Sequence, residues 1–210
     1  SEWSRGQLNV SAYFTEIGDQ QREVNLASAA AGVLQLIQNT ADTEIMGIEI
    51  DGTFALTDNL TVLASVGALD AEYTSVRFDL NGDGVVDDAD KRLNLPRAPE
   101  LTYSISAIYD FDIGNSGYLS SRISYAYRDE TSYTDNNLGF ILEQDILDIS
   151  LDFHTANSNW VVSLYGRNLL DTVRHGGDTQ LGFIGPIPTF GTFSPLSAPA
   201  TYGVEVNYNY

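Results

Sequence analysis

The segment of this sequence with the clearest capacity for chemistry is the acidic stretch 79–90, DLNGDGVVDDAD. Its oxygen-bearing side chains recur at the spacing that wraps ligands around a hard cation, and a glycine at the sixth position allows the sharp turn. The expected ligands are the side chains of Asp79, Asn81, Asp83, Asp87 and Asp90 and the main-chain carbonyl of Val85. Mg²⁺ should substitute poorly, because it holds its waters and requires a tighter octahedron. The spacing therefore predicts one structural Ca²⁺ in this loop.

The last position of this stretch leaves an alternative open. It holds Asp90 instead of the usual, longer glutamate, so that the segment resembles dockerin loops more than sensor EF-hand loops. The alternative is an acidic, glycine-rich loop with no fixed ion.

Other residue types that could do chemistry form no recognisable site. His154 and His175 are far apart and have no neighbouring ligand pattern, which argues against a transition-metal site. The sequence has no G-x-S-x-G motif and no arrangement of a catalytic triad. We therefore do not expect an enzyme.

Composition excludes two further classes of protein. The net charge of -19 argues against nucleic acid as a partner, because phosphate binding needs a basic surface. No apolar run approaches the roughly 18 to 20 residues of a membrane-spanning helix. A transmembrane β-barrel stays possible, because each of its strands needs only about 9 to 11 residues of alternating character.

Alternation with a period of two is the main structural signal. At 202–210, aromatic residues and valines alternate without exception with glycine and polar residues. Seven more segments share this period with varying regularity, at 8–15, 46–56, 60–72, 101–111, 119–128, 147–154 and 159–169. The sequence therefore predicts about eight strands.

The connections between these segments alternate in length. Those at 57–59, 112–116 and 156–159 are short, whereas those at 18–43, 74–99, 129–144 and 170–200 are long. Tight turns on one side and long loops on the other are typical of an outer-membrane barrel, with the long loops outside. Within these loops we expect a short helix at 27–37 over the barrel mouth. We expect prolines 186, 188, 195 and 199 to keep the last loop irregular, leaving Phe183, Phe190 and Phe193 as possible contacts.

A soluble antiparallel sandwich would alternate as well. Against it are the strand lengths of about 10 to 13 residues, where soluble strands usually have about 5 to 6. Charged residues also occupy the face opposite the apolar one: Glu49, Asp51, Arg122, Arg128, Asp148 and Asp152. A water-lined lumen accommodates such charges, and the apolar face then belongs to lipid. Aromatic girdles are expected at one rim from Tyr109, Phe111, Trp160, Tyr208 and Tyr210 and at the other from Tyr125 and Tyr127.

Several stretches resemble the C-terminal barrel half of TonB-dependent receptors. They are NTADTEIMGIE at 39–49, LTDNLTVLASVGALDAEY at 56–73, LPRAPELTY at 95–103 and LYGRNLLD at 164–171. The terminal aromatic Tyr210 resembles the signal for assembly into the outer membrane. The whole of 1–210 is thus expected to form about eight C-terminal strands of an all-β, antiparallel barrel of about 22 strands, with 79–90 as a calcium-loop insertion in an extracellular loop. The first residues already suggest a strand and carry no export signal, so we expect a piece of a longer chain.

The resemblance implies TonB-dependent uptake of a scarce solute, such as a metal chelate, a cofactor or an oligosaccharide, in the outer membrane of a Gram-negative bacterium. The implied partners are outer-membrane lipid, TonB acting through an upstream plug, the solute and possibly another extracellular or outer-membrane protein. The alternatives are a structural or adhesive outer-membrane barrel and a calcium-stabilised soluble sandwich, neither with transport activity.

Overall fold

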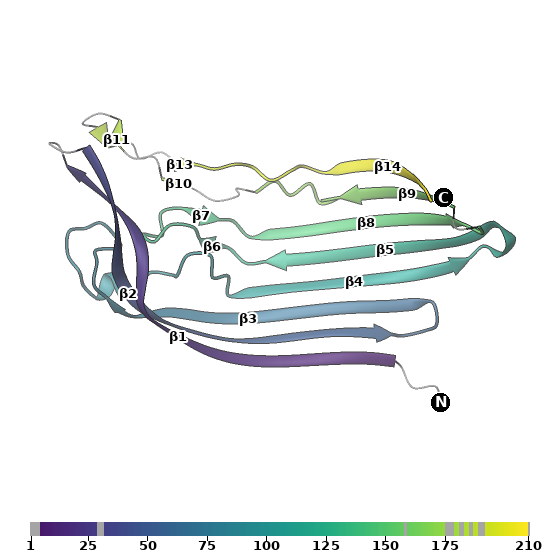
Figure 1. Cartoon of the computed structure of the whole chain (residues 1–210), viewed down its shortest axis with the longest axis horizontal. Helices are drawn as coiled ribbons and strands as arrows, with labels where there is room; N and C mark the ends of the chain where they lie inside the picture. Colours follow the sequence, from purple (N-terminus) through teal and green to yellow (C-terminus); the bar gives the residue numbers. More distant parts are fainter. Residues whose placement is uncertain are drawn as a thin grey trace.

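The fold is one large antiparallel sheet, seen in a computed structural model that describes residues 5–28, 32–157, 159–174, 179–180, 183–184, 187–188 and 192–209. The sheet strands are β1 (Arg5–Ser28), β2 (Gly32–Ala55), β3 (Leu60–Val76), β4 (Leu101–Asp112), β5 (Gly117–Arg128), β8 (Gln144–Thr155), β9 (Trp160–Arg167) and β14 (Thr201–Tyr208). Each pairs with the next, so that sheet order follows chain order, and the sheet stays open between its edge strands β1 and β14 (Figure 1). The expected all-β fold with about eight antiparallel strands is confirmed.

The three expected short turns join strands at one end of the sheet. In the β2–β3 turn, the Thr57 hydroxyl accepts hydrogen bonds from the backbone N–H groups of Asn59 and Leu60, at 3.2 and 3.0 Å. The β4–β5 turn contains the short 3₁₀ helix η1 (Gly114–Ser116), after which Gly117 adopts a φ of 128°. The longer connections gather at the opposite end, on the left in Figure 1.

The two faces of the sheet differ sharply in polarity. The registers align apolar side chains on one face, and this face is uncovered: Leu8 is 59% exposed and Val204 is 66% exposed. A soluble sandwich would bury this face against a second sheet, whereas a barrel presents it to lipid. The sandwich alternative is therefore ruled out.

Aromatic side chains mark both edges of the apolar face. Toward the short turns, the ring centroids of Tyr109 and Phe111 are 4.4 Å apart and those of Trp160 and Tyr208 are 4.6 Å apart. Toward the long connections, Tyr127 stacks on Tyr103 at 5.0 Å and Tyr125 lies 6.1 Å from Tyr103. The expected girdles are present in the described residues, outside which Tyr210 lies.

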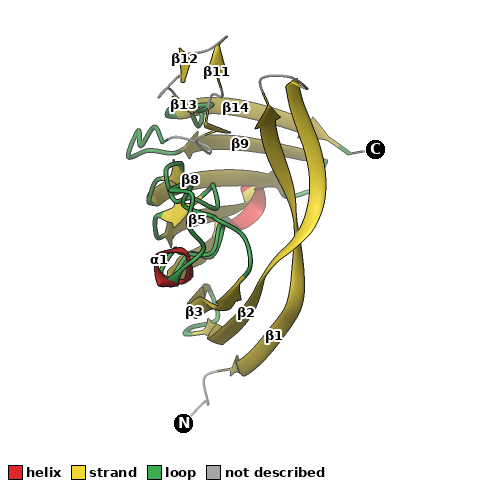
Figure 2. Cartoon of the chain, turned by 90° about the vertical axis from the view of Figure 1, so that its left-hand side faces the viewer, coloured by secondary structure: helices red, strands yellow, loops and turns green. Residues whose placement is uncertain are grey.

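The predicted loop at 18–43 is wrong, because β1 and β2 continue through most of it as one long hairpin (Figure 2). The helix predicted at 27–37 is wrong as well: 27–28 and 32–37 are strand, and 29–31 lie outside the described residues. Because β1 and β2 are already paired in the barrel wall, each further residue pair joins their ladder at little further entropic cost. This gain overrides the helical preference of a short alanine-rich segment. The ladder shifts register near Gln20, where Asp19 adopts a φ of 54°.

The long connections hold further small elements. The third contains β6 (Thr131–Ser132) and β7 (Phe140–Ile141), and the last contains β10 (Thr179–Gln180), β11 (Phe183–Ile184), β12 (Ile187–Pro188) and β13 (Thr192–Phe193). β10 pairs with β13 and β11 with β12, so the irregular structure expected from the prolines is only partly found. A proline is compatible with the end of such a two-residue edge strand. Phe190 and His175 lie outside the described residues.

A small apolar core lies at the outer end of the sheet. Ala41 and Tyr73 are buried there against Leu80 and Leu95 of the connection after β3. That connection also contains the helix α1 (Asp88–Lys91), which contacts β3. No helix in the described ranges is long and apolar enough to cross a membrane.

Candidate functional site

A hollow of about 430 Å³ opens on the polar, inner face of the sheet. Its charged lining consists of Arg122, Asp148, Asp152, Arg167 and Glu205, from four neighbouring strands. The registers explain why these residues share a face: Asp152 pairs with Ser163, and Ser163 pairs with Glu205. Alternation along each strand then brings the remaining members to the same side.

The charges of this hollow lie near one another without forming ion pairs. None of the four ion pairs found in the described chain involves them. Asp148 instead accepts a hydrogen bond of 2.8 Å from the backbone N–H of Asn168, and the Arg167 guanidinium lies 4.9 Å from the centre of the Tyr165 ring. The hollow can therefore offer both hydrogen-bond donors and acceptors to a polar molecule or protein segment.

The inner face continues as a polar surface across the other strands. Asn9 donates a hydrogen bond of 2.8 Å to Asp51, and the hydroxyls of Ser65 and Ser104 are 2.8 Å apart. Each of the six charged residues assigned to this face from the sequence pairs in register with a polar residue on at least one neighbouring strand. The sequence reasoning missed Arg167, because the valines on both sides of β9 hide its alternation.

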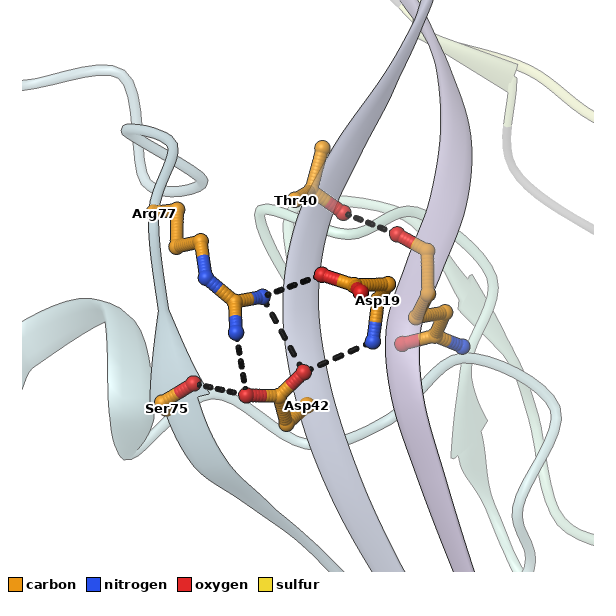
Figure 3. A network of polar contacts seen from close by, with 6 residues as sticks. Asp19, Thr40, Asp42, Ser75 and Arg77 are labelled. Carbon is orange, nitrogen blue, oxygen red and sulfur yellow. Dashed lines mark hydrogen bonds and ion pairs between the residues drawn. The ribbon is translucent and has the colours of Figure 1, made fainter.

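A polar network ties the long β1–β2 hairpin to the end of β3 (Figure 3). The Asp42 carboxylate accepts bonds from the Arg77 guanidinium, from the Ser75 hydroxyl at 2.6 Å and from the backbone N–H of Asp19 at 2.7 Å. Arg77 also lies 3.5 Å from the Asp19 carboxylate. Arg77 above all, then Ser75 and Asp19, hold the pKa of Asp42 well below its usual range. The network fastens the hairpin where its ladder shifts register.

Asp42→Asn should loosen this end of the hairpin. The neutral amide loses the charge-assisted bonds to Arg77, and Asp19 is then the one ionic partner of Arg77 among the described residues. We expect several-fold faster proteolytic cleavage within 18–43 of the complete receptor at neutral pH. Because the pKa of Asp42 is lowered on folding, the difference between wild type and variant should begin to shrink as the pH falls below about 4 and should vanish only as the pH falls through the lowered pKa of the folded state.

Asp58→Asn, in the exposed turn after β2, is the matched control and should leave cleavage unchanged. Equal cleavage of wild type and Asp42→Asn at neutral pH would show that the network does not fasten the hairpin.

A second ionic contact ties the hairpin to the third long connection. Arg22 of β1 lies 3.0 Å from Asp135. Tyr73 is buried beside this pair, and burial raises its pKa to about 12. The hairpin is thus tied to two different connections at the outer end of the sheet.

The predicted calcium loop is folded through hydrogen bonds to its own backbone. The Asp79 carboxylate accepts N–H bonds from Gly82 and Gly84, both at 2.7 Å, and from Asp83 at 3.2 Å. Gly82 and Gly84 both have positive φ angles, as a sharp turn requires.

Asp90 has a further role in this loop. It is fully buried and accepts N–H bonds from Leu80, Asn81 and Asp87, closing the loop and capping α1. Asn81, Asp83 and Asp87 likewise accept bonds from nearby backbone N–H groups. In the part of the chain that the structure describes, no three acidic or histidine side chains are grouped as metal ligands would be. In Asp79 and in Asp90, Oδ1 already accepts two N–H groups, whereas Oδ2 accepts one and keeps a second lone pair. Carboxylate oxygens are the ligands that Ca²⁺ prefers, but ligation requires these side chains to turn toward a common centre.

A family model described as "TonB dependent receptor-like, beta-barrel" matches residues 2–169. No curated protein matches the chain in sequence. Among solved structures, the ferric yersiniabactin uptake receptor FyuA from Yersinia pestis aligns over 100% of this chain and 28% of its own, with 15% identity and a TM-score of 0.76.

Two further solved structures share the fold. The siderophore receptor PiuA from Acinetobacter baumannii has 16% identity and a TM-score of 0.67, covering 97% of this chain and 26% of its own. The copper transporter OprC has 16% identity and a TM-score of 0.65, covering 98% and 30%. The chain therefore spans less than a third of the solved chains it matches. Proteins of this family are bacterial outer-membrane receptors or transporters and not enzymes. With most of its length matched by the family model, the chain belongs to the TonB-dependent receptor-like β-barrel family and is part of an outer-membrane protein.

Proposed function

We propose that the complete protein imports a scarce solute through a plugged barrel, with energy passed from TonB, and that this chain forms part of the barrel wall. The observation that carries the proposal is the single sheet with an uncovered apolar outer face and a charged inner face. In lipid, such a sheet lines a polar conduit. Its partners would be outer-membrane lipid, the solute, and TonB through an upstream plug.

The solute belongs to a class such as metal chelates, cofactors or oligosaccharides. The solved structures that share the fold include a ferric yersiniabactin uptake receptor, a siderophore receptor and a copper transporter, which favours a metal-containing solute. The competing proposal is a structural or adhesive barrel. The open edges of β1 and β14 count against a stand-alone eight-stranded barrel, because closure needs these two strands to pair.

Uptake in cells tests the proposal. Wild-type cells, a deletion strain and a strain with inactive TonB would receive radiolabelled ferric chelates, copper, cobalamin and maltooligosaccharides. We expect uptake of at least one probe to fall in both altered strains and to return when the complete gene is restored to the deletion strain. Equal uptake of every probe by wild-type and deletion cells, with reduced surface adhesion in the deletion strain, would favour the adhesive barrel.

A structural calcium ion in the loop after β3 is part of the same proposal. Asp79, Asn81, Asp83, Asp87 and Asp90 with the Val85 carbonyl would hold it and would order the loop at the outer mouth. The positive φ angles of Gly82 and Gly84 support it, because they bring the carboxylates of one short segment into a tight turn. The ion would supply positive charge to a segment of high negative charge and would have no part in transport chemistry.

Calcium titration of the purified complete receptor tests this ion. We expect binding at about 10⁻⁴ to 10⁻³ M and protection of 79–90 from proteolysis, lost with a chelator and in Asp79→Ala and Asp83→Ala variants. Asp58→Ala serves as the control. Loop proteolysis that is identical with and without chelator, in wild type and variants, would mean that backbone hydrogen bonds alone hold the loop.

A further inference from the structure

The third long connection, with the first residues of β8, is strongly acidic. Between 129 and 145 the chain carries Asp129, Glu130, Asp135, Glu143 and Asp145 and no lysine or arginine. Glu130 and Glu143 are exposed there. We call 129–145 the acidic mouth segment, since it lies at the end of the sheet where the long connections gather (Figure 1).

The basic side chains that reach this segment already have partners. Arg22 lies 3.0 Å from Asp135, and Arg174 lies 3.4 Å from Asp145 and donates from Nε to the Glu143 carbonyl at 2.6 Å. The Arg97 guanidinium lies over the Tyr133 ring, 4.9 Å from its centre. An anionic solute is bound best by arginines free to clamp its oxygens. Two of them, Arg22 and Arg174, are held by carboxylates of the segment itself, and Asp129, Glu130 and Glu143 have no ion pair among the described residues.

The inner wall has the same excess of negative charge. Its carboxylates are Glu49, Asp51, Asp110, Asp112, Asp148, Asp152 and Glu205, against the guanidinium groups of Arg5, Arg122, Arg128 and Arg167. Most of these side chains are exposed on the inner face of the described sheet. A route with an excess of one sign of charge raises the local concentration of ions of the opposite sign and repels ions of its own sign.

We infer that this protein takes up a neutral or cationic solute, such as a metal cation or a chelate without net negative charge, and discriminates against anionic chelates. The inference rests on the proposed import function and adds the charge class of the solute. The acidic mouth segment raises the rate at which a cationic solute associates with the receptor, and the carboxylates of the inner wall extend the negative potential along the inside of the barrel.

Charge reversal in the purified complete receptor tests the inference. The variants are Glu130→Lys and Glu143→Lys, both at exposed positions. Asp58→Lys, in the exposed β2–β3 turn at the opposite end of the sheet, is the matched control. The probes are Cu²⁺, a tris-hydroxamate ferric chelate bearing one free ammonium group, and a tris-catecholate ferric chelate of charge 3−. Association rates would be measured by fluorescence quenching at about 10 mM and about 300 mM salt. Salt screens long-range electrostatic attraction, so an effect that disappears at high salt comes from charge and not from the loss of a direct contact with the probe.

We expect wild type to bind a cationic probe and not the catecholate chelate. Both mouth variants should slow cation association several-fold at low salt, with little effect at high salt, while Asp58→Lys behaves as wild type. Preferred binding of the catecholate chelate, binding of no cationic probe, or equal effects of all three reversals would overturn the inference. A cationic probe that binds as expected but enters cells independently of TonB would overturn the import function and leave the charge preference standing.

Discussion

Ile123→Arg should destabilise the complete receptor in a bilayer by about 2–4 kcal/mol, the effect of an arginine near the midplane of a barrel's lipid face. Ile123 is 47% exposed on the outer face and lies in register with Ala107 and Ile149, at mid-height between the aromatic girdles. At that depth the guanidinium has no water and no described carboxylate on its own face to pair with. The cost should appear in urea titrations of receptor folded into vesicles.

Ser106→Arg is the control for this substitution. Ser106 pairs in register with Ser124 on the inner face, at nearly the same height as Ile123. An arginine there meets water and the inner carboxylates, so the free energy of unfolding should change by less than about 1 kcal/mol. Equal destabilisation by both variants would contradict the assignment of the outer face to lipid.

Gly117→Val should destabilise the receptor by about 3 kcal/mol or more. Gly117 has a φ of 128°, which an L side chain rarely adopts, and an added Cβ would clash with the carbonyl oxygen of His154 on the neighbouring strand. The backbone of β8 cannot yield easily, so the start of β5 must move and lose its pairing with Thr155. Heat-dependent gel mobility of the folded receptor and urea titration would both report the loss.

Gly114→Asn separates the strain of a positive φ from the steric clash. Gly114 lies in the same turn with a φ of 62°, but an added Cβ would meet nothing within 4 Å, and asparagine tolerates this conformation well. We expect a change within about 1 kcal/mol. If Gly117→Val were as mild as Gly114→Asn, the close approach of β5 and β8 at this turn would be wrong.

The barrel strands could be predicted from the sequence because lipid and water impose opposite chemistry on alternate residues. In β4, Leu101, Tyr103 and Ile105 face one side while Thr102 and Ser104 face the other, and the structure pairs them accordingly. The outer half of the β1–β2 hairpin could not be predicted in this way. This part of the hairpin extends beyond the lipid-facing surface of the sheet. Because no lipid contacts it, neither of its sides is required to be apolar.

The inner charges were predictable for the same reason, since each is one member of an alternating strand. The contacts that fasten the mouth were not. Asp42 and Arg77, like Arg22 and Asp135, come together through three-dimensional register and loop packing, which leave no periodic trace. The buried position of Asp90 was missed too, because a carboxylate that caps a loop and one that ligates a cation occupy the same positions in the sequence.

The agreement between sheet order and chain order has a consequence for biogenesis. Every described pairing of the large sheet joins neighbours along the chain, so the sheet can grow hairpin by hairpin with a small entropic cost at each step. Until β1 and β14 meet partner strands, their free N–H and C=O groups are templates for pairing with another molecule. A receptor stalled at this stage would be a nucleus for aggregation, so folding in the cell depends on shielding both strands until the barrel closes.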